Sequence, residues 1–245
     1  MKSFLDTETT GIDEKDRIIQ LSFLLKHDNG LINIYDDLCK PEVEINPGAM
    51  ATHHITPEMI EGKPLLRDCA AFKTLNEINS PNNIIVIHNT PFDLDMLKKE
   101  GFENKMRIID TLHIAKHLWP DIESRSLQYL RYYFCLYQRE EELLRKIAIG
   151  VRKVVPHDAV GDVIVLYQLY LYLRENFSDD DLLALTQKPI LLTKLNFGKK
   201  HYGKLIIDVV KGDPKYVNWM LKEATISEEM RHSLNYHKKE YWRQK

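Results

Sequence analysis

The 245-residue chain has only three cysteines, Cys39, Cys69 and Cys135, which lie far apart in the sequence. An odd number of cysteines without a Cys-x-x-Cys pair argues against a disulfide framework and against a zinc site. The sequence also lacks an apolar run near the 18 residues of a membrane helix, and it shows no signal peptide. We therefore expect a protein of the reducing cytoplasm without a membrane partner.

Charge of one sign is not in excess overall, because 34 Lys and Arg stand against 36 Asp and Glu. The charges are unevenly distributed, however. Residues 186–245 hold 13 Lys and Arg against 6 Asp and Glu, about +7, and the rest of the chain holds 21 against 30, about −9. A basic C-terminal region favours a polyanion partner, although a solvated surface explains the same counts equally well.

Hydrophobic patterning predicts a mixed α/β domain over most of the chain. Residues 1–6, 18–26 and 31–39 have strand character, and the Asn-Gly pair before the third run is typical of a hairpin turn. Strands followed by alternating strands and helices indicate an α/β layer fold. Further strands are expected at 84–88 and 107–110, a loop at 41–57, and helices at 68–79, from 91 onward, and at 111–117, 126–134, 139–149 and 158–176.

A change of composition near residues 178–189 predicts a domain boundary. We expect a main domain over residues 1–178, a small basic and aromatic appendage over 186–224, and a basic tail over 225–245. A short capped helix is predicted within the appendage, over residues 213–220.

Lysines and aromatic residues in the appendage are candidates for weak contacts with a nucleic acid. Lysines supply phosphate contacts, and aromatic rings supply stacking faces for bases. Alternatively, the aromatic rings form the core of a small domain, and we favour that position for Trp219. The candidate lysines are Lys199, Lys200, Lys204 and Lys215, and the aromatic residues are Tyr202, Tyr216 and Trp219.

Two carboxylates, Asp6 and Glu8, stand two residues apart at the end of the N-terminal apolar run. Side chains alternate along a strand, so both carboxylates point to the same side. Such a pair suits a hard divalent cation such as Mg²⁺, which prefers oxygen ligands. Because an ordinary turn contains the same residue types, the interpretation depends on further acidic positions.

Two later segments supply such positions. Asp93 is in the first turn of a predicted helix after a buried strand, at the sheet edge where α/β proteins place their sites. His157 and Asp162 are five residues apart, which on an ideal helix separates their directions by about 140°. We therefore expect Asp162 on the helix and His157 in the loop before it. Taken singly, Asp93 also fits an acid at a helix N-terminus, and the other two fit solvated surface residues.

Taken together in this order, the segments resemble the DEDDh 3′–5′ exonuclease family over residues 1–176. The resemblance implies an α/β fold with an RNase H-like mixed sheet flanked by helices. The chain departs from the family pattern at two places. In the segment 53–56, His54 replaces the usual Gly. Residues 137–155, which precede the segment 157–162, are longer and more helical than the link usually found there. The matching segments are Asp6-Thr-Glu8-Thr-Thr-Gly11, His53-His54-Ile55-Thr56, His88-Asn89-Thr-Pro-Phe92-Asp93, Asp110-Thr111-Leu112, Ser126-Leu127 and His157-Asp-Ala159-Val-Gly-Asp162.

The resemblance implies a metal-dependent 3′–5′ exonuclease that releases 5′-mononucleotides from nucleic acid with a free 3′ end. DNA is favoured as the substrate, and a polymerase or a repair protein is a further partner. His157 acts as the general base. The implied ligands of two divalent ions, Mg²⁺ or Mn²⁺, are Asp6, Glu8, Asp93 and Asp162, and the implied contacts to the terminal nucleotide are Thr9, Thr10, His53 and Phe92.

Three alternatives remain open from the sequence. The same fold serves exoribonucleases that trim RNA 3′ ends, and it also serves modules that bind nucleic acid without catalysis. The Asp-x-Glu-x-Thr segment faintly resembles the Asp-x-Asp-x-Thr of haloacid dehalogenase-like phosphatases. Its second acid differs from that pattern, and the two later motifs would have no explanation.

Overall fold

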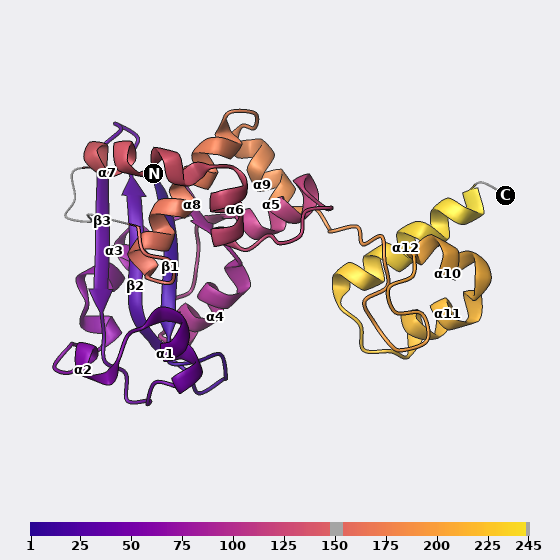
Figure 1. The fold of residues 1–245 in the computed structure, drawn as a ribbon, viewed down its shortest axis with the longest axis horizontal. Coiled ribbons are helices and arrows are strands. Elements are labelled where there is room, and N and C mark those ends of the chain that lie inside the picture. Colours follow the sequence, from indigo (N-terminus) through magenta and orange to yellow (C-terminus); the bar gives the residue numbers. More distant parts are fainter. Residues whose placement is uncertain (148–153, 244–245) are drawn as a thin grey trace. The chain divides into compact units, whose positions relative to one another are not determined.

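The computed structural model describes residues 1–147 and 154–243, and the chain forms two compact units, residues 1–186 and 187–245. The first unit contains a five-stranded sheet in the order β3-β2-β1-β4-β5 (Figure 1). β1 pairs antiparallel with β2 and parallel with β4. The strands are β1 (Lys2–Thr9), β2 (Ile18–Lys26), β3 (Ile32–Leu38), β4 (Ile84–Ile87) and β5 (Arg107–Asp110).

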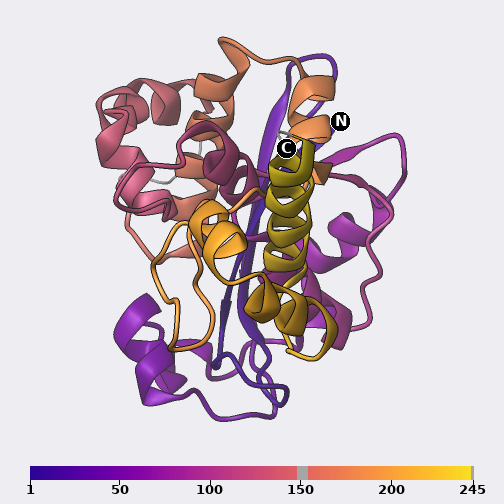
Figure 2. The ribbon, with the colours of Figure 1, turned by 90° about the vertical axis from the view of Figure 1, so that its right-hand side faces the viewer.

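Helices cover both faces of this sheet, as Figure 2 shows. The alternation of β1 sends Phe4 into a core shared with α8 and Leu5 into a core shared with α3 and α4. The Phe4 ring packs edge-on against Tyr167 and Tyr170 of α8, with centroids 4.8 and 5.0 Å apart. The mixed sheet between two helical layers confirms the predicted fold class.

The helices of the first unit occur largely where the hydrophobic pattern predicts them. α8 is buried along most of its length, so it shows no polar stripe. The α-helices are α1 (Pro47–His53), α2 (Pro57–Ile60), α3 (Ala70–Glu77), α4 (Thr90–Lys99), α5 (Thr111–Leu118), α6 (Leu127–Tyr133), α7 (Glu140–Ile147), α8 (Ala159–Arg174) and α9 (Asp179–Gln187), and the 3₁₀ helices are η1 (Leu66–Asp68) and η2 (Leu136–Arg139).

The segment 41–57, predicted as a loop, instead contains α1. The side chain of Asn46 accepts a hydrogen bond from the Gly48 N–H at 2.8 Å, and Pro47 follows directly. An N-cap residue followed by proline is a helix start, so the Pro and Gly punctuation was misleading here. The predicted helix over 139–149 corresponds to α7, and residues 148–153 of the long link lie outside the described residues.

The second unit contains three helices, α10 (Ile206–Gly212), α11 (Pro214–Lys222) and α12 (Glu228–Arg243), among its described residues. α11 is the predicted capped helix, and the Asp213 side chain accepts from the Tyr216 N–H at its start. The predicted tail over 225–245 is instead largely helical, and Met230 and Leu234 of α12 are buried in the core of this unit.

The boundary between the units also differs from the predicted end of the main domain at residue 178. α9 belongs to the first unit, because Leu182 is fully buried in the core with α8. The Thr186 hydroxyl also accepts a hydrogen bond from the backbone N–H of Asp110 at 3.0 Å.

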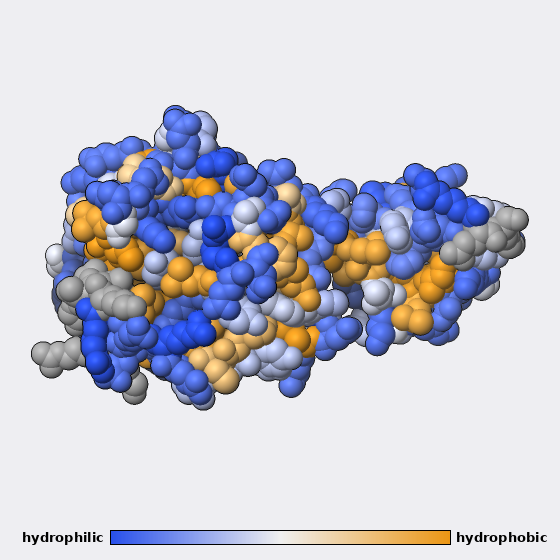
Figure 3. Space-filling model, turned by 90° about the horizontal axis from the view of Figure 1, so that it is seen from above, coloured by the Kyte–Doolittle hydropathy of each residue, from blue (hydrophilic) through white to orange (hydrophobic). Residues whose placement is uncertain are grey.

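The surface seen in Figure 3 is mainly hydrophilic, with separate apolar patches. Among the described residues, no helix combines the length and the apolar character that crossing a membrane requires.

Candidate active site

Three acidic side chains converge at the carboxyl end of β1. Asp6, Glu8 and Asp162 each offer a carboxylate oxygen, and these oxygens lie within 4.8 Å of one another. Alternation along β1 places Asp6 and Glu8 on the face covered by α8, and Asp162 projects from the first turn of that helix. The structure thus brings together three of the four acids that the sequence singled out.

The fourth acid, Asp93, approaches from the opposite face of the sheet. It is buried in the first turn of α4, and its Oδ1 accepts a hydrogen bond from the Thr7 hydroxyl at 2.8 Å. Its oxygens are not in the group within 4.8 Å. Asp93 nevertheless lies close to Asp6. Burial is the largest cause of the raised pKa of Asp6, and the charge of Asp93 is the second largest.

Burial raises the pKa of all four acids, and the charges of the other acids raise those of Asp6 and Glu8 further. The pKa of Asp6 lies well above its usual value, chiefly because of burial. Burial, aided by the charge of Asp162, raises the pKa of Glu8 to about 8. Burial likewise raises the pKa of Asp93 to about 7 and that of Asp162 to about 6. An oxygen-only set of acids that resist joint ionisation fits a hard divalent cation such as Mg²⁺ or Mn²⁺.

His157 lies in the turn before α8, as the five-residue spacing predicts, and its side chain is exposed. Its backbone is left-handed, with φ 58°. The charge and the backbone N–H of His157 both lower the pKa of Asp162, so the two residues are neighbours. A Cβ at Gly161 would collide with the Val155 carbonyl oxygen, so the loop before His157 packs tightly against the first turn of α8.

A pocket of about 460 Å³ opens beside Glu8 and is lined by Thr9, His53 and Phe92. His53 is buried, which lowers its pKa. Its Nδ1 accepts from the Ile55 N–H at 2.9 Å, so the neutral ring donates from Nε2 to the Thr9 carbonyl at 3.2 Å. Three of the four residues predicted to contact a terminal nucleotide therefore share one pocket next to the carboxylates.

Thr10, the fourth predicted nucleotide contact, does not face this pocket. Its side chain is fully buried, donates to Asp16 Oδ1 at 2.8 Å and accepts from the Arg17 N–H at 3.0 Å. Thr10 thus holds the loop 11–16, which lines the pocket. In that loop the Ile12 side chain is 83% exposed.

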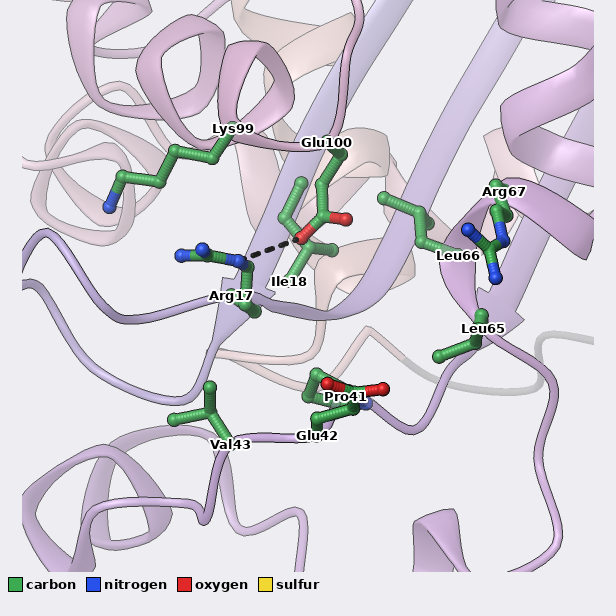
Figure 4. A pocket seen from close by; sticks show the side chains of 10 residues that line it. All are labelled: Arg17, Ile18, Pro41, Glu42, Val43, Leu65, Leu66, Arg67, Lys99 and Glu100. Atoms are coloured by element: carbon green, nitrogen blue, oxygen red, sulfur yellow. Dashed lines mark ion pairs between the residues drawn. The ribbon is translucent and has the colours of Figure 1, made fainter.

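A second pocket, of about 400 Å³, is lined by Arg17, Lys99 and Glu100 among others (Figure 4). Arg17 Nε lies 3.9 Å from the Glu100 carboxylate. Arg17 also donates to the Glu14 carbonyl, and Lys99 Nζ donates to the Asp13 carbonyl at 2.8 Å. These cations are engaged in holding the loop 11–16, so they supply no anion site.

His54 occupies the position where the resembled family has glycine. Its backbone is left-handed, with φ 61° and ψ 13°, and it ends α1. Glycine adopts this conformation without steric cost, which accounts for the family pattern.

Several polar partners of the acids were not identified from the sequence. Asp162 accepts a hydrogen bond from Gln128, which is 34 residues away, and Asp158 accepts one from Gln20 at 2.9 Å across 138 residues. Thr7 and Asp93 are 86 residues apart. Such pairs form only through the tertiary fold, so no local pattern reveals them.

In the second unit, the candidate lysines differ in how they are held. Lys200 Nζ lies 2.6 Å from Asp213 Oδ2 and 5.6 Å from the centre of the Tyr216 ring. Lys204 Nζ lies 3.4 Å from His201 Nδ1, whereas Lys199 and Lys215 are simply exposed.

The expected core position of Trp219 is wrong. Its side chain is 42% exposed beside Tyr216, with ring centroids 5.4 Å apart, and Tyr202 is 70% exposed. Val217 and Met220, on the other side of α11, fill the core.

The chain is similar to known exonucleases. The RNase_T model, described as exonuclease, matches residues 3–170. Exodeoxyribonuclease 10 of Escherichia coli K12 is 27% identical over 97% of this chain and 98% of its own length. DNA polymerase III subunit epsilon of Buchnera aphidicola is 35% identical over 47% of this chain and 54% of its own.

Among solved structures, exonuclease X in complex with 5′ overhanging duplex DNA is similar in fold, with a TM-score of 0.58 and 24% identity over 76% of this chain and 99% of that chain. The E. coli ExoI–ssDNA complex with zinc gives a TM-score of 0.51 and 20% identity over 75% of this chain and 44% of that chain.

Proposed function

Because the chain belongs to the DEDDh 3′–5′ exonuclease family, we propose that it removes 5′-mononucleotides from the 3′ end of DNA with the help of two divalent ions, Mg²⁺ or Mn²⁺. The observation that carries this proposal is the cluster of Asp6, Glu8 and Asp162, whose oxygens lie within 4.8 Å of one another, with Asp93 beside it. DNA is favoured because a relative similar over 97% of this chain is named an exodeoxyribonuclease.

The four acids Asp6, Glu8, Asp93 and Asp162 would hold the metal ions. Bound ions of this kind lower the pKa of an attacking water and stabilise charge on the attacking and leaving oxygens of a phosphodiester. His157 would accept a proton from the attacking water, since imidazole is the side chain most often used as a general base. Its exposed place next to Asp162 leaves it open to water and substrate.

The pocket beside Glu8 holds the 3′-terminal nucleotide in this proposal. Phe92 offers an apolar ring to the nucleotide. The hydrogen bond from His53 to the Thr9 carbonyl holds these two lining residues of the pocket together. Thr10 contributes indirectly, because it secures the loop 11–16 that closes one side of the pocket.

The second unit binds the same strand away from the reacting end. Its net charge of about +7 attracts phosphates, and its exposed rings offer stacking surfaces. Lys199, Lys204 and Lys215 make the phosphate contacts, since Lys200 is already paired with Asp213. Tyr202 also offers a stacking ring, because it is 70% exposed.

Two observations support a cellular setting for this activity. Similarity to a polymerase III epsilon subunit, over 47% of this chain, favours a role in replication or repair beside a polymerase or repair protein. All three cysteines are free, which favours a reducing compartment such as the cytoplasm.

The decisive experiment is digestion of matched single-stranded DNA, duplex DNA and RNA, each labelled at the 3′ or the 5′ end, with Mg²⁺ and with EDTA. We expect a labelled mononucleotide to be released at once from 3′-labelled DNA, whereas 5′-labelled DNA shortens stepwise. EDTA should stop both reactions. Preference for RNA would instead identify an exoribonuclease, and binding without release would identify a non-catalytic module.

A further inference from the structure

A series of side-chain hydrogen bonds runs from Asp162 to the beginning of α7. Gln128 of α6 donates from Nε2 to Asp162 Oδ1 and accepts through Oε1 from Arg131 Nη1 at 3.0 Å. Arg131 then forms a bidentate ion pair with Glu140, with Nε–Oε1 at 2.5 Å and Nη2–Oε2 at 2.7 Å. Four residues from three helices are therefore linked without a gap.

The two neighbours of Gln128 determine which way its amide points. A carboxylate only accepts hydrogen bonds and a guanidinium only donates them. If the amide were reversed, its oxygen would face Asp162 and its NH₂ group would face Arg131, so neither hydrogen bond could form. Arg131 therefore aims the amide donor of Gln128 at Asp162.

The far end of the series is fixed as well. The Arg131 and Glu140 side chains are only 8% and 12% exposed. A buried bidentate ion pair holds its geometry better than an ion pair on the surface. With its amide oriented so that both groups find a partner, the buried Gln168 of α8 accepts from the Glu140 N–H at 3.2 Å and donates to the Leu136 carbonyl at 3.0 Å. The start of α7 is thereby attached to the same helix that carries Asp162.

On the basis of the metal-dependent function proposed above, we propose that Gln128 is a positioning residue for Asp162, and that Arg131 and Glu140 hold Gln128 in place. Partners of metal ligands orient them and commonly change metal affinity or activity by about 10- to 100-fold when removed. Glu140 lies near the beginning of the long link 137–155, so this part of the link would help to position Asp162.

The test replaces Gln128 by leucine, which has a similar size and no hydrogen-bond donor. Binding of Mn²⁺ to the full chain is measured by calorimetry, and the Mg²⁺ concentration for half-maximal nuclease rate is measured in parallel. We expect Gln128→Leu to weaken Mn²⁺ binding by about 10-fold or more and to raise the half-saturating Mg²⁺ concentration similarly. The KM for DNA should change little, because Gln128 is not assigned to the substrate pocket.

Glu140→Gln is the second variant, and Glu141→Gln is its matched control. Glu141 is the next residue on α7 and pairs with Arg145, but both side chains are largely exposed, 82% and 74%. Glu140→Gln should weaken Mn²⁺ binding measurably, and Glu141→Gln should leave it unchanged. Combined with Gln128→Leu, the Glu140 change should cause no further loss of Mn²⁺ affinity, because the two residues act through one contact.

Several results would overturn the inference. One is a folded Gln128→Leu protein whose Mn²⁺ affinity is within about twofold of the wild type. Others are equal effects of Glu140→Gln and Glu141→Gln, or additive losses in the double variant. If Gln128→Leu does not fold, Gln128→Asn replaces it, and failure of both would assign Gln128 to stability alone. A wild-type chain that neither binds Mn²⁺ nor degrades DNA would instead refute the proposed function.

Discussion

The two units use charge in opposite ways. In the first unit, which carries about −9, acids of one sign are gathered and buried, and the pKa of Asp6 is raised by burial and by Asp93. In the second, which carries about +7, the charges lie on the surface, and the Lys200 side chain holds the pKa of Asp213 below its usual value. Buried acids that repel one another without a bound cation indicate a catalytic site, whereas charges dispersed over a surface indicate binding at most.

The largest expected effect comes from removing a single acid of the first unit. Asp6→Ala, Asp93→Ala or Asp162→Ala should each abolish nuclease turnover while the fold is kept, because each change removes a ligand and relieves repulsion. The measurement is the release of mononucleotide from a 3′-labelled strand. Asp95→Asn is the control, because Asp95 is an exposed acid on the same helix as Asp93. A variant with near wild-type rate would remove its residue from the set.

The next largest effect should follow from replacing His157. His157→Ala should lower the rate by about 10²–10⁴, the usual range for a positioned general base, and calorimetric metal binding should change little. His157→Asn should behave alike, and asparagine tolerates the left-handed backbone found there, with φ 58°.

His54→Asn is the matched control, since His54 is also exposed and left-handed, with φ 61°. Loss of metal binding in His157→Asn would show that His157 acts as a ligand and not as the base.

Removing the second unit should produce a moderate effect on binding. A chain ending at Gln187 should still digest a short oligonucleotide, because all four acids and His157 lie upstream. It should bind a long single strand more weakly, and its log–log salt dependence should be flatter by about 0.7 for each phosphate that the second unit binds in the full chain.

Single lysine variants of the full chain sharpen this comparison. Lys199→Ala should weaken binding more than Lys200→Ala, because Lys200 is already engaged with Asp213 at 2.6 Å. Identical salt slopes for the full and shortened chains would show that the second unit serves another purpose, such as binding a protein.

The smallest expected effect is the pH dependence of stability without metal. The pKa of Glu8 is raised to about 8 and that of Asp93 to about 7, whereas such acids titrate near 4 when unfolded. Between about pH 4 and pH 8 the native protein therefore binds more protons than the unfolded one, so its stability falls as pH rises. In EDTA, the Tm near pH 8 should lie below the Tm near pH 5.

Mg²⁺ should reduce this difference, because a cation favours the ionised acids. Asp6→Asn should reduce it in EDTA as well, since it removes one of the repelling charges. If neither change altered the pH dependence of Tm, the raised pKa values of Glu8 and Asp93 would not govern the stability of the protein in EDTA.

The sequence predicted the sheet, α8 and the acid cluster because their signals are local. Alternation fixes Asp6 and Glu8 on one face, and the continuous apolar run at 84–87 marks a central strand. The helix α1 lies where proline and glycine predict a loop, because Asn46 before Pro47 forms a helix start.

Burial and tertiary contacts were harder to predict. Trp219 was expected in the core because it is large and apolar, yet α11 turns Val217 and Met220 inward instead. Thr10 was expected at the substrate by family resemblance, and its hydrogen bond to Asp16 depends on the turn of the loop. The Gln128–Asp162 contact spans 34 residues, so it exists only in the folded chain.

The segment 157–162 leaves no room for a side chain at Gly161. A methyl group there would collide with the Val155 carbonyl oxygen and force the loop that carries His157 away from α8. Gly161→Ala would therefore increase the distance between His157 and the acids, although every reactive group would still be present. The missing side chain at position 161 is therefore what lets the loop that carries His157 pack directly against the helix that carries Asp162.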